Sequence, residues 1–199
     1  STQGVSSAAS DVYKRQDQQI KVKIEEKYSR AAKGGVGYAK AAGNYAAQFY
    51  PTILANEEGY QQIIWTDSSK HEYIEEAGAM NIFIRINDTL ITGPTSDRIL
   101  DGVTRKSIID IAKSEGIKVE VRKFTVSELI EASNNGSLKE MFGTGTAAVI
   151  SPIAVYGYKD TDYALPKLEK TFASRLKERI TSIQTNKSED PFNWRFKVN

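Results

Sequence analysis

The sequence of 199 residues contains no cysteine and a single histidine, His71. The lack of cysteine excludes disulfides, zinc fingers and thiol catalysis, and it fits a reducing compartment. His71 lies in the polar stretch 67–72, which is typical of a surface loop. We therefore predict neither a metal site nor a Ser-His-Asp catalytic set.

The chain also lacks a strong charge of one sign and any long apolar run. It has 27 basic and 25 acidic residues, a net charge of +2, which is too weak to predict a nucleic acid or membrane-surface partner. No apolar run approaches the ~18 residues of a membrane span, and no signal-peptide core is visible. A hydrophobic share of 40% is ordinary for a soluble globular protein. We expect one soluble domain with no nucleic acid or membrane partner.

The first 19 residues have little to bury. They are rich in Ser, Ala and Gln, and residues 5–16 resemble adapter-derived sequence found at the ends of assembled gene fragments. We expect residues 1–19 to be a disordered or non-native leader. The folded domain is then expected to span residues 20–199.

Beyond the leader, two kinds of hydrophobic periodicity mix without a regular strand-helix-strand cadence. Alternation and β-rich composition predict strands at 21–25, 61–66, 81–86, 89–92 and 118–122, and one or two more within 140–153. Helical spacing predicts helices at 45–56, 103–115, 125–132 and 166–185. We expect Asn44 and Thr125 to cap two of these helices. The mixture predicts a mixed α/β domain that is not doubly wound.

One lysine, Lys40, lies in a loop of small residues that spans positions 34–45. Small neighbours leave room for a bulky reactant, and Tyr45 supplies a hydroxyl five positions further on. Burial disfavours the charged form of lysine, so a buried Lys40 could form a Schiff base with a carbonyl cofactor. The loop taken alone fits an ordinary surface lysine more often than a catalytic one.

Two acidic residues, Glu75 and Glu76, are adjacent in the sequence. On an extended strand they face opposite sides, so one can point inward and the other to solvent. An inward carboxylate could keep a pyridine nitrogen protonated. The alternative is that both lie on a solvated surface, which is the usual place of glutamate.

Two glycine-containing segments could bind an anion. Residues 102–104 open a predicted helix, whose free N–H groups and positive dipole end suit a phosphate. Residues 143–146, with the sequence Gly-Thr-Gly-Thr, form a predicted turn between strands. Each signal is weak alone, and neither carries the lysine of a nucleotide-binding P-loop.

Taken together, these clusters resemble those of branched-chain amino acid aminotransferases, which are pyridoxal-phosphate enzymes of fold type IV. The resemblance runs from about Glu25 to Asn199 in the family's order and spacing. It is carried by the stretches Arg30 to Gly35, Lys40 to Tyr45, Glu76 to Phe83, Gly102 to Arg105 and Glu140 to Ala147. It implies a mixed-strand pseudo-barrel with surrounding helices, the large domain of a fold type IV aminotransferase.

The resemblance also implies a role for each site residue. Lys40 would carry pyridoxal 5'-phosphate and act as the catalytic base and acid, and Glu76 would hold the ring nitrogen. The remaining cofactor-binding residues would be Arg30, Tyr45, Val103, Thr104 and Thr146, with Ala79, Thr146 and Ala147 at the substrate. Tyr45 would contact the phenolic oxygen of the cofactor. Val103, Thr104 and Thr146 would bind its phosphate.

The implied activity is transamination of leucine, isoleucine or valine with 2-oxoglutarate, by a cytoplasmic homodimer acting in branched-chain amino acid biosynthesis. Family members carry a smaller N-terminal domain that has no counterpart in this sequence. We therefore expect the isolated chain to be an N-terminally truncated fragment that binds the cofactor poorly and is weakly active or inactive. The alternatives are a D-amino acid aminotransferase or aminodeoxychorismate lyase of the same fold, or a non-catalytic binding domain.

Overall fold

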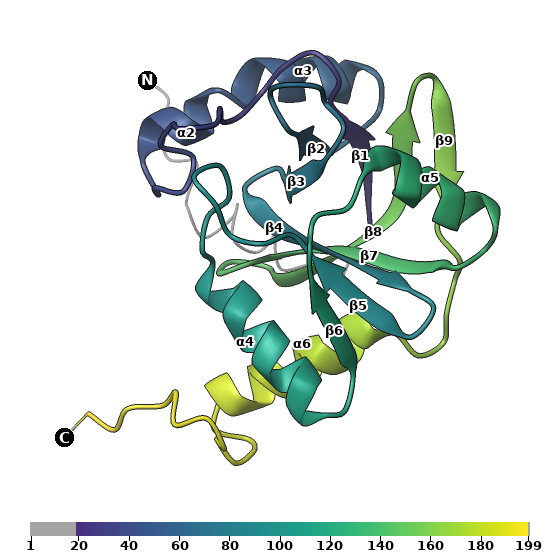
Figure 1. The fold of residues 1–199 in the computed structure, drawn as a ribbon. Coiled ribbons are helices and arrows are strands. Elements are labelled where there is room, and N and C mark those ends of the chain that lie inside the picture. The colour runs from purple at the N-terminus through teal and green to yellow at the C-terminus, as the bar shows by residue number, and fades with distance from the viewer. Residues whose placement is uncertain (1–18, 199) are drawn as a thin grey trace, which may run out of the picture.

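A computed structural model of the chain describes residues 19–198. The leader predicted at 1–19 therefore lies, apart from Gln19, outside the described residues. The described part holds one mixed sheet of nine strands (Figure 1), and its order is β3-β2-β1-β8-β7-β4-β5-β6, with β9 paired to β8. The strands are β1 Ile20–Ile24, β2 Gln62–Thr66, β3 Ile74–Ala77, β4 Met80–Ile86, β5 Thr89–Thr92, β6 Lys118–Val121, β7 Leu138–Gly145, β8 Val149–Tyr158 and β9 Thr161–Ala164.

An additional pairing between β3 and β4 closes part of this sheet into a ring. The ring comprises β1, β2, β3, β4, β7 and β8. β1 runs parallel to both β2 and β8, whereas β2–β3, β3–β4, β4–β7 and β7–β8 are antiparallel. The predicted mixed-strand pseudo-barrel is thus confirmed.

Alternating side chains of the ring strands build two large cores, and Ile63 and Trp65 of β2 form a third, smaller cluster with Ala55. One core draws on all six ring strands and on α5 (Val126–Asn134), so it fills the interior of the ring. The other lies on the outer surface, where Phe83 and Phe142 stack with their centroids 5.3 Å apart. It is completed by α4 (Val103–Ser114) and α6 (Phe172–Gln184). Ile82 belongs to the inner core and Phe83 to the outer one, so Asn81 faces outward with Phe83.

The helices surround the ring on several sides (Figure 1). α2 (Ala42–Ala46) and α3 (Phe49–Glu57) lie at the end opposite α4 and α6 in this view. The predicted capping role of Asn44 is wrong, because α2 begins after Ala41 and Asn44 lies inside it. The amide of Asn44 instead donates to the carbonyls of Val36 and Ala39, at 2.6 and 2.7 Å. It therefore ties α2 back to the preceding loop.

Other predictions hold in part. Thr125 caps α5 as expected, since its Oγ1 accepts from the Glu128 N–H at 3.0 Å. The helix predicted from residue 166 begins only at Phe172, after the cap Thr171, and the short strands β3 and β9 were not predicted. Residues 165–171 connect β9 to α6, and Pro166 lies in this connection.

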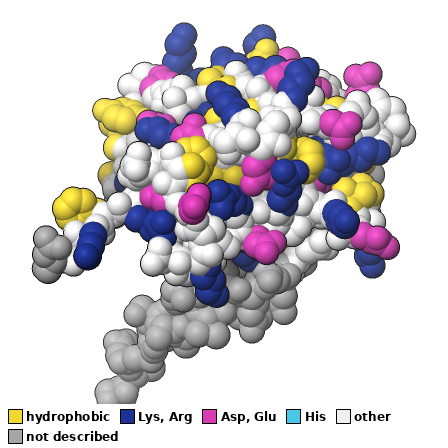
Figure 2. Space-filling view, turned by 90° about the horizontal axis from the view of Figure 1, so that it is seen from below, with side chains coloured by type: hydrophobic (Ala, Val, Ile, Leu, Met, Phe, Trp, Pro, Cys, Tyr) yellow, Lys and Arg dark blue, Asp and Glu magenta, His cyan; other side chains and the backbone are white. Residues whose placement is uncertain are grey.

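The surface shows no concentration of one charge on the face seen in Figure 2. Lysine and arginine side chains alternate there with aspartate and glutamate, as the net charge of +2 predicts. Within residues 19–198, no helix is long and apolar enough to cross a membrane.

Candidate active site

The site is built around an irregularity in β3. Trp65 of β2 lies opposite Glu76, and Thr66 lies opposite Ile74, so Glu75 has no counterpart on β2. Such a β-bulge interrupts the alternation of side-chain directions and is common beside active sites. Both glutamates are buried, with exposed fractions of 6% and 3%. The prediction that one of them points to solvent is therefore wrong.

Each of the two glutamates has an arginine partner. Glu76 Oε2 lies 3.0 Å from Arg30 Nε, and both side chains are 4% exposed. Glu75 Oε1 lies 2.5 Å from Arg98 Nε. A buried carboxylate is retained in its charged form only when it is paired and hydrogen-bonded. The two arginines, which come from loops far apart in sequence, offset part of the cost of burying the two carboxyl groups.

The second oxygen of Glu76 is held by neutral donors. Glu76 Oε1 accepts from the Leu100 N–H at 3.0 Å and from Asn81 Nδ2 at 3.2 Å. Asn81 also donates to the Leu100 carbonyl at 2.8 Å. These contacts fix the plane of the carboxyl group. Oε2, which accepts from Arg30, keeps a lone pair for a further donor.

Tyr45 is coupled electrostatically to Glu76 and Arg30. Burial raises the pKa of Glu76 to about 7, while Arg30 and the Leu100 N–H oppose the rise and Glu75 adds to it. The pKa of the Tyr45 phenol is raised by burial and by Glu76, and Arg30 lowers it. Three predicted site residues, Arg30, Tyr45 and Glu76, are therefore within electrostatic reach of one another. An acid that titrates near neutrality suits proton sharing with a basic nitrogen.

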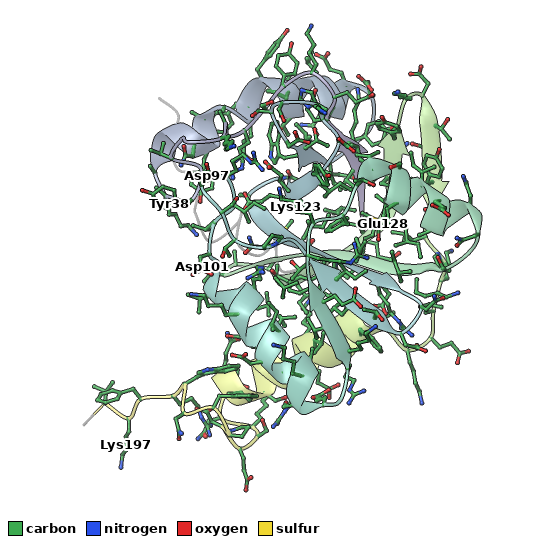
Figure 3. All side chains as sticks on the ribbon, in the orientation of Figure 1. Tyr38, Asp97, Asp101, Lys123, Glu128 and Lys197 are labelled. Atoms are coloured by element: carbon green, nitrogen blue, oxygen red, sulfur yellow. The ribbon has the colours of Figure 1, made fainter. Side chains whose placement is uncertain are left out.

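Lys40 lies in the loop just before α2, and its side chain is exposed. The prediction that Lys40 is buried is thus wrong for this structure. The small side chains around it provide little apolar surface to cover the amine. The loop itself is anchored, because Arg30 Nη1 donates to the Gly37 carbonyl at 3.3 Å and the Tyr38 N–H donates to the Asp97 carbonyl at 3.1 Å. Figure 3 shows Tyr38 and Asp97 together on the side of the molecule where α2 and the start of α4 lie.

The start of α4 adjoins Glu76 through Asn81. A Cβ placed on Gly102 would overlap with Asn81 Oδ1, so only glycine permits this approach. Gly102 is the N-cap, no side chain caps α4, and its first turn has no acidic residue. Asp101 pairs with Lys106 instead, at 2.5 Å. The N–H groups of Val103 and of the half-buried Thr104 therefore stand at a positive helix end.

The β7–β8 turn completes the set. Thr144 lies opposite Asn81, and Asn81 lies opposite Glu76, so their three side chains form one row on the outer face of the ring. The Thr144 Oγ1 is buried and has no hydrogen-bond partner among the described residues. Thr146 and Ala147 follow in the exposed turn.

Ala79 belongs to the same end of the strands. It lies in the exposed turn between β3 and β4. The next residue, Met80, packs against the end of β7 just before the β7–β8 turn, since a Cβ on Gly143 or Gly145 would lie 2.7 or 3.4 Å from its side chain. The turns predicted to meet the substrate are therefore neighbours.

Three members of the site, Asn81, Arg98 and Thr144, had no assigned role in the sequence. Asn81 precedes the apolar run Ile82–Ile84 of β4 and is itself buried, and a polar residue at a buried strand position is a signal that could have identified it. Arg98 carries no comparable local signal. Its pairing with Glu75 joins positions 23 residues apart and depends on the bulge.

Comparison with known proteins assigns the chain to a family. The family model described as "Amino-transferase class IV" matches residues 5–156. Because this match covers most of the sequence, the chain belongs to the class IV aminotransferase family. The match includes every predicted site residue from Arg30 to Ala147.

Individual relatives are more specific. The chain is 43% identical over 179 residues to a probable branched-chain-amino-acid aminotransferase of Staphylococcus epidermidis. The aligned residues make up 89% of this chain and 50% of the relative. It is 41% identical over 187 residues to branched-chain-amino-acid aminotransferase 2 of Bacillus subtilis, with 94% and 52% covered. The chain thus spans about half the length of these curated relatives.

Solved structures agree in fold. The branched-chain amino acid aminotransferase of Escherichia coli superposes with a TM-score of 0.74 at 28% identity, over 88% of this chain and 56% of that one. A branched-chain amino acid aminotransferase from T.th., complexed with N-(5'-phosphopyridoxyl)-L-glutamate, gives a TM-score of 0.77 at 25% identity. That match covers 92% of this chain and 57% of the other.

Proposed function

We propose that this chain carries the cofactor site of a branched-chain amino acid transaminase that uses pyridoxal 5'-phosphate and 2-oxoglutarate. The observation that supports this most directly is the Glu76 carboxylate, held by Arg30, Asn81 and Leu100 beside the uncapped start of α4. Relatives of this family bear the name of this activity. The donor types present are those that an aromatic phosphate requires.

The described residues fit such a cofactor in three respects. The spare lone pair of Glu76 Oε2 can accept a ring N–H. The N–H groups of Val103 and Thr104 at the start of α4, which no side chain caps, can donate to a phosphate. The buried Thr144 hydroxyl, in the row formed with Glu76 and Asn81, lacks a hydrogen-bond partner among the described residues and can therefore donate to the cofactor.

The proposed roles follow from these positions. When bound, pyridoxal phosphate supplies a carbonyl that bonds to amines and a protonated ring that withdraws electrons from the substrate α-carbon. Lys40 Nζ holds the cofactor and takes up and returns the α-proton as general base and acid. Glu76 retains the proton at the ring nitrogen, Tyr45 contacts the phenolic oxygen, and Thr146 adds its hydroxyl to the phosphate site.

The substrates would enter from the side of the exposed turns. The N–H groups at Thr146 and Ala147 are proposed to bind the carboxylate of the amino acid or 2-oxo acid, with Ala79 opposite them. This assignment is supported by the packing of the neighbouring Met80 against the end of β7, just before the β7–β8 turn. We further propose a cytoplasmic homodimer, for which the exposed apolar side chains of α3, such as Phe49 and Ile53, provide a contact surface.

The role of Lys40 can be tested by reductive trapping. The chain is incubated with pyridoxal phosphate, reduced with borohydride and mapped by mass spectrometry. We expect the phosphopyridoxyl label to concentrate on Lys40 and to disappear from that peptide in Lys40→Ala. Lys33, an exposed lysine of the same loop, serves as the internal reference, and Lys33→Ala should leave the Lys40 label unchanged. Equal labelling of Lys33 and Lys40 would contradict the proposed function.

A further inference from the structure

Arg30 is unusual among the predicted cofactor-binding residues because all three of its nitrogen atoms are already engaged by protein. Its Nε pairs with Glu76 Oε2 at 3.0 Å, Nη1 donates to the Gly37 carbonyl at 3.3 Å, and Nη2 donates to the Arg98 carbonyl. The side chain is 4% exposed. A guanidinium in this setting is held in one orientation by its rigid fork of donors.

These contacts join three separate segments. Glu76 is on β3, Gly37 is three residues before Lys40, and Arg98 lies in the loop that leads to Leu100 and α4. A Cβ on Gly37 would lie 2.9 Å from the Arg98 Cα, so the Lys40 loop packs directly on this second loop. Arg30 therefore links the acid, the lysine loop and the approach to the helix N-terminus.

We propose that Arg30 is a positioning residue that acts on the bound cofactor through Glu76, not by contacting the phosphate or the substrate itself. It would hold Oε2 in place to accept from the ring N–H, and it opposes the rise in the pKa of Glu76 that burial causes. Through the Gly37 carbonyl it also fixes the loop that carries Lys40 relative to that carboxylate. The inference rests on the proposed function.

The surroundings of Glu76 support this assignment. Glu75 on the same strand and the Tyr45 phenol from α2 are the other titratable groups that face it, and Arg98 is paired with Glu75. Arg30 is thus the cation that contacts Glu76 among the described residues. Burial and Glu75 both favour the protonated form of Glu76, and Arg30 opposes them.

The experiment follows the Glu76 carboxyl ¹³C signal by NMR during a pH titration of the chain without cofactor, with Glu76→Gln used to assign the signal. We expect Arg30→Met to raise the apparent pKa of Glu76 by about one unit or more. Arg30→Lys, which keeps the charge, should restore most of the difference. Arg98→Met is the matched control, because it removes the neighbouring arginine that pairs with Glu75, and it should not raise the Glu76 pKa.

A second measurement covers the case in which Arg30→Met does not fold. The Arg30 Nε–H should exchange slowly with solvent in the wild-type chain and several-fold faster in the nearly isosteric Glu76→Gln, whereas Glu75→Gln should leave it slow. An unchanged Glu76 titration in Arg30→Met, or unchanged exchange in Glu76→Gln, would overturn the role of Arg30. Either result combined with Lys40-specific labelling would leave the proposed function intact. If instead the Glu76 pKa and the Arg30 exchange rate change as expected but Lys40 is not specifically labelled, the proposed function is wrong. The role of Arg30 toward the cofactor is then wrong as well.

Discussion

At the scale of single residues, the site depends on a carboxyl group that is costly to bury. Glu76 is 3% exposed, and burial raises its pKa from an ordinary value of 4.5 to about 7. In the folded chain the carboxyl group therefore binds a proton more tightly than it does in the unfolded chain. Folding stability consequently depends on pH through this one residue.

We expect Glu76→Gln to change how stability varies with pH. Below pH 4.5 Glu76 is protonated in both states, and between pH 4.5 and 7 the folded state holds a proton that the unfolded state has released. The wild-type chain should therefore lose stability relative to Glu76→Gln as the pH rises through this window, by on the order of 3 kcal/mol. Urea denaturation at a series of pH values measures the difference.

The control for this prediction is Glu72→Gln, an exposed residue near the start of β3. It should leave the pH dependence of stability unchanged. A constant difference between wild type and Glu76→Gln from pH 4.5 to 7 would show that the carboxyl group is not buried as described.

At the scale of elements, α6 depends on one residue of the sheet. Glu140 of β7 is 6% exposed and accepts from the N–H groups of Phe172 and Ala173, at 2.8 and 3.0 Å. It also pairs with Arg85 Nη1 at 2.8 Å. A carboxylate at a helix N-terminus is stabilised by the free N–H groups and by the helix dipole. Together with the Thr171 cap, this contact fixes where α6 begins.

We expect Glu140→Ala to destabilise the chain by about 3 kcal/mol, because it leaves the N–H groups of Phe172 and Ala173 and the Nη1 of Arg85 without their acceptor. The free energy of unfolding in urea measures the loss. Glu178→Ala on α6 itself removes an exposed carboxylate and should change stability by less than about 0.5 kcal/mol. Equal effects of the two substitutions would contradict an anchoring role for Glu140.

Some features of the elements could be predicted from the sequence, and others could not. Alternation at Val22 and Ile24 and the turn at Asn87 predicted their strands correctly, because these signals are local. The bulge at Glu75 could not be predicted, since it depends on the register between β2 and β3. Asn44 resembles a cap in sequence, but its amide satisfies loop carbonyls instead. Lys40 was predicted to be buried but is exposed, because the geometry of its loop decides whether its side chain is covered.

At the scale of the whole molecule, apolar side chains remain exposed on one part of the surface. Phe49, Tyr50 and Ile53 of α3 are 66%, 58% and 53% exposed, and Val36 and Tyr38 of the preceding loop are 61% and 57% exposed. Apolar residues that gather on a surface in this way are typical of contact surfaces. Glu76 and Lys40 were proposed as site residues from sequence motifs, whereas this surface depends on tertiary structure.

We expect the chain to self-associate through α3 in a concentration-dependent manner. Replacing Phe49 and Ile53 together by Glu should weaken association at least about tenfold, the equivalent of about 1.4 kcal/mol. Sedimentation velocity over a range of concentrations measures this. Phe196→Glu, in the C-terminal segment at 90% exposure, is the control. Association that is equally strong in both variants would exclude α3 as the contact.

The closure of the ring has a consequence for synthesis on the ribosome. β1 pairs with β8, and these strands lie about 130 residues apart in the sequence. Translation at ~5–20 residues per second separates their emergence by on the order of ten seconds. During that interval the nascent β1 has an unpaired edge toward β8, and such edges favour aggregation. Efficient production of this protein should therefore depend on chaperones that bind extended nascent segments.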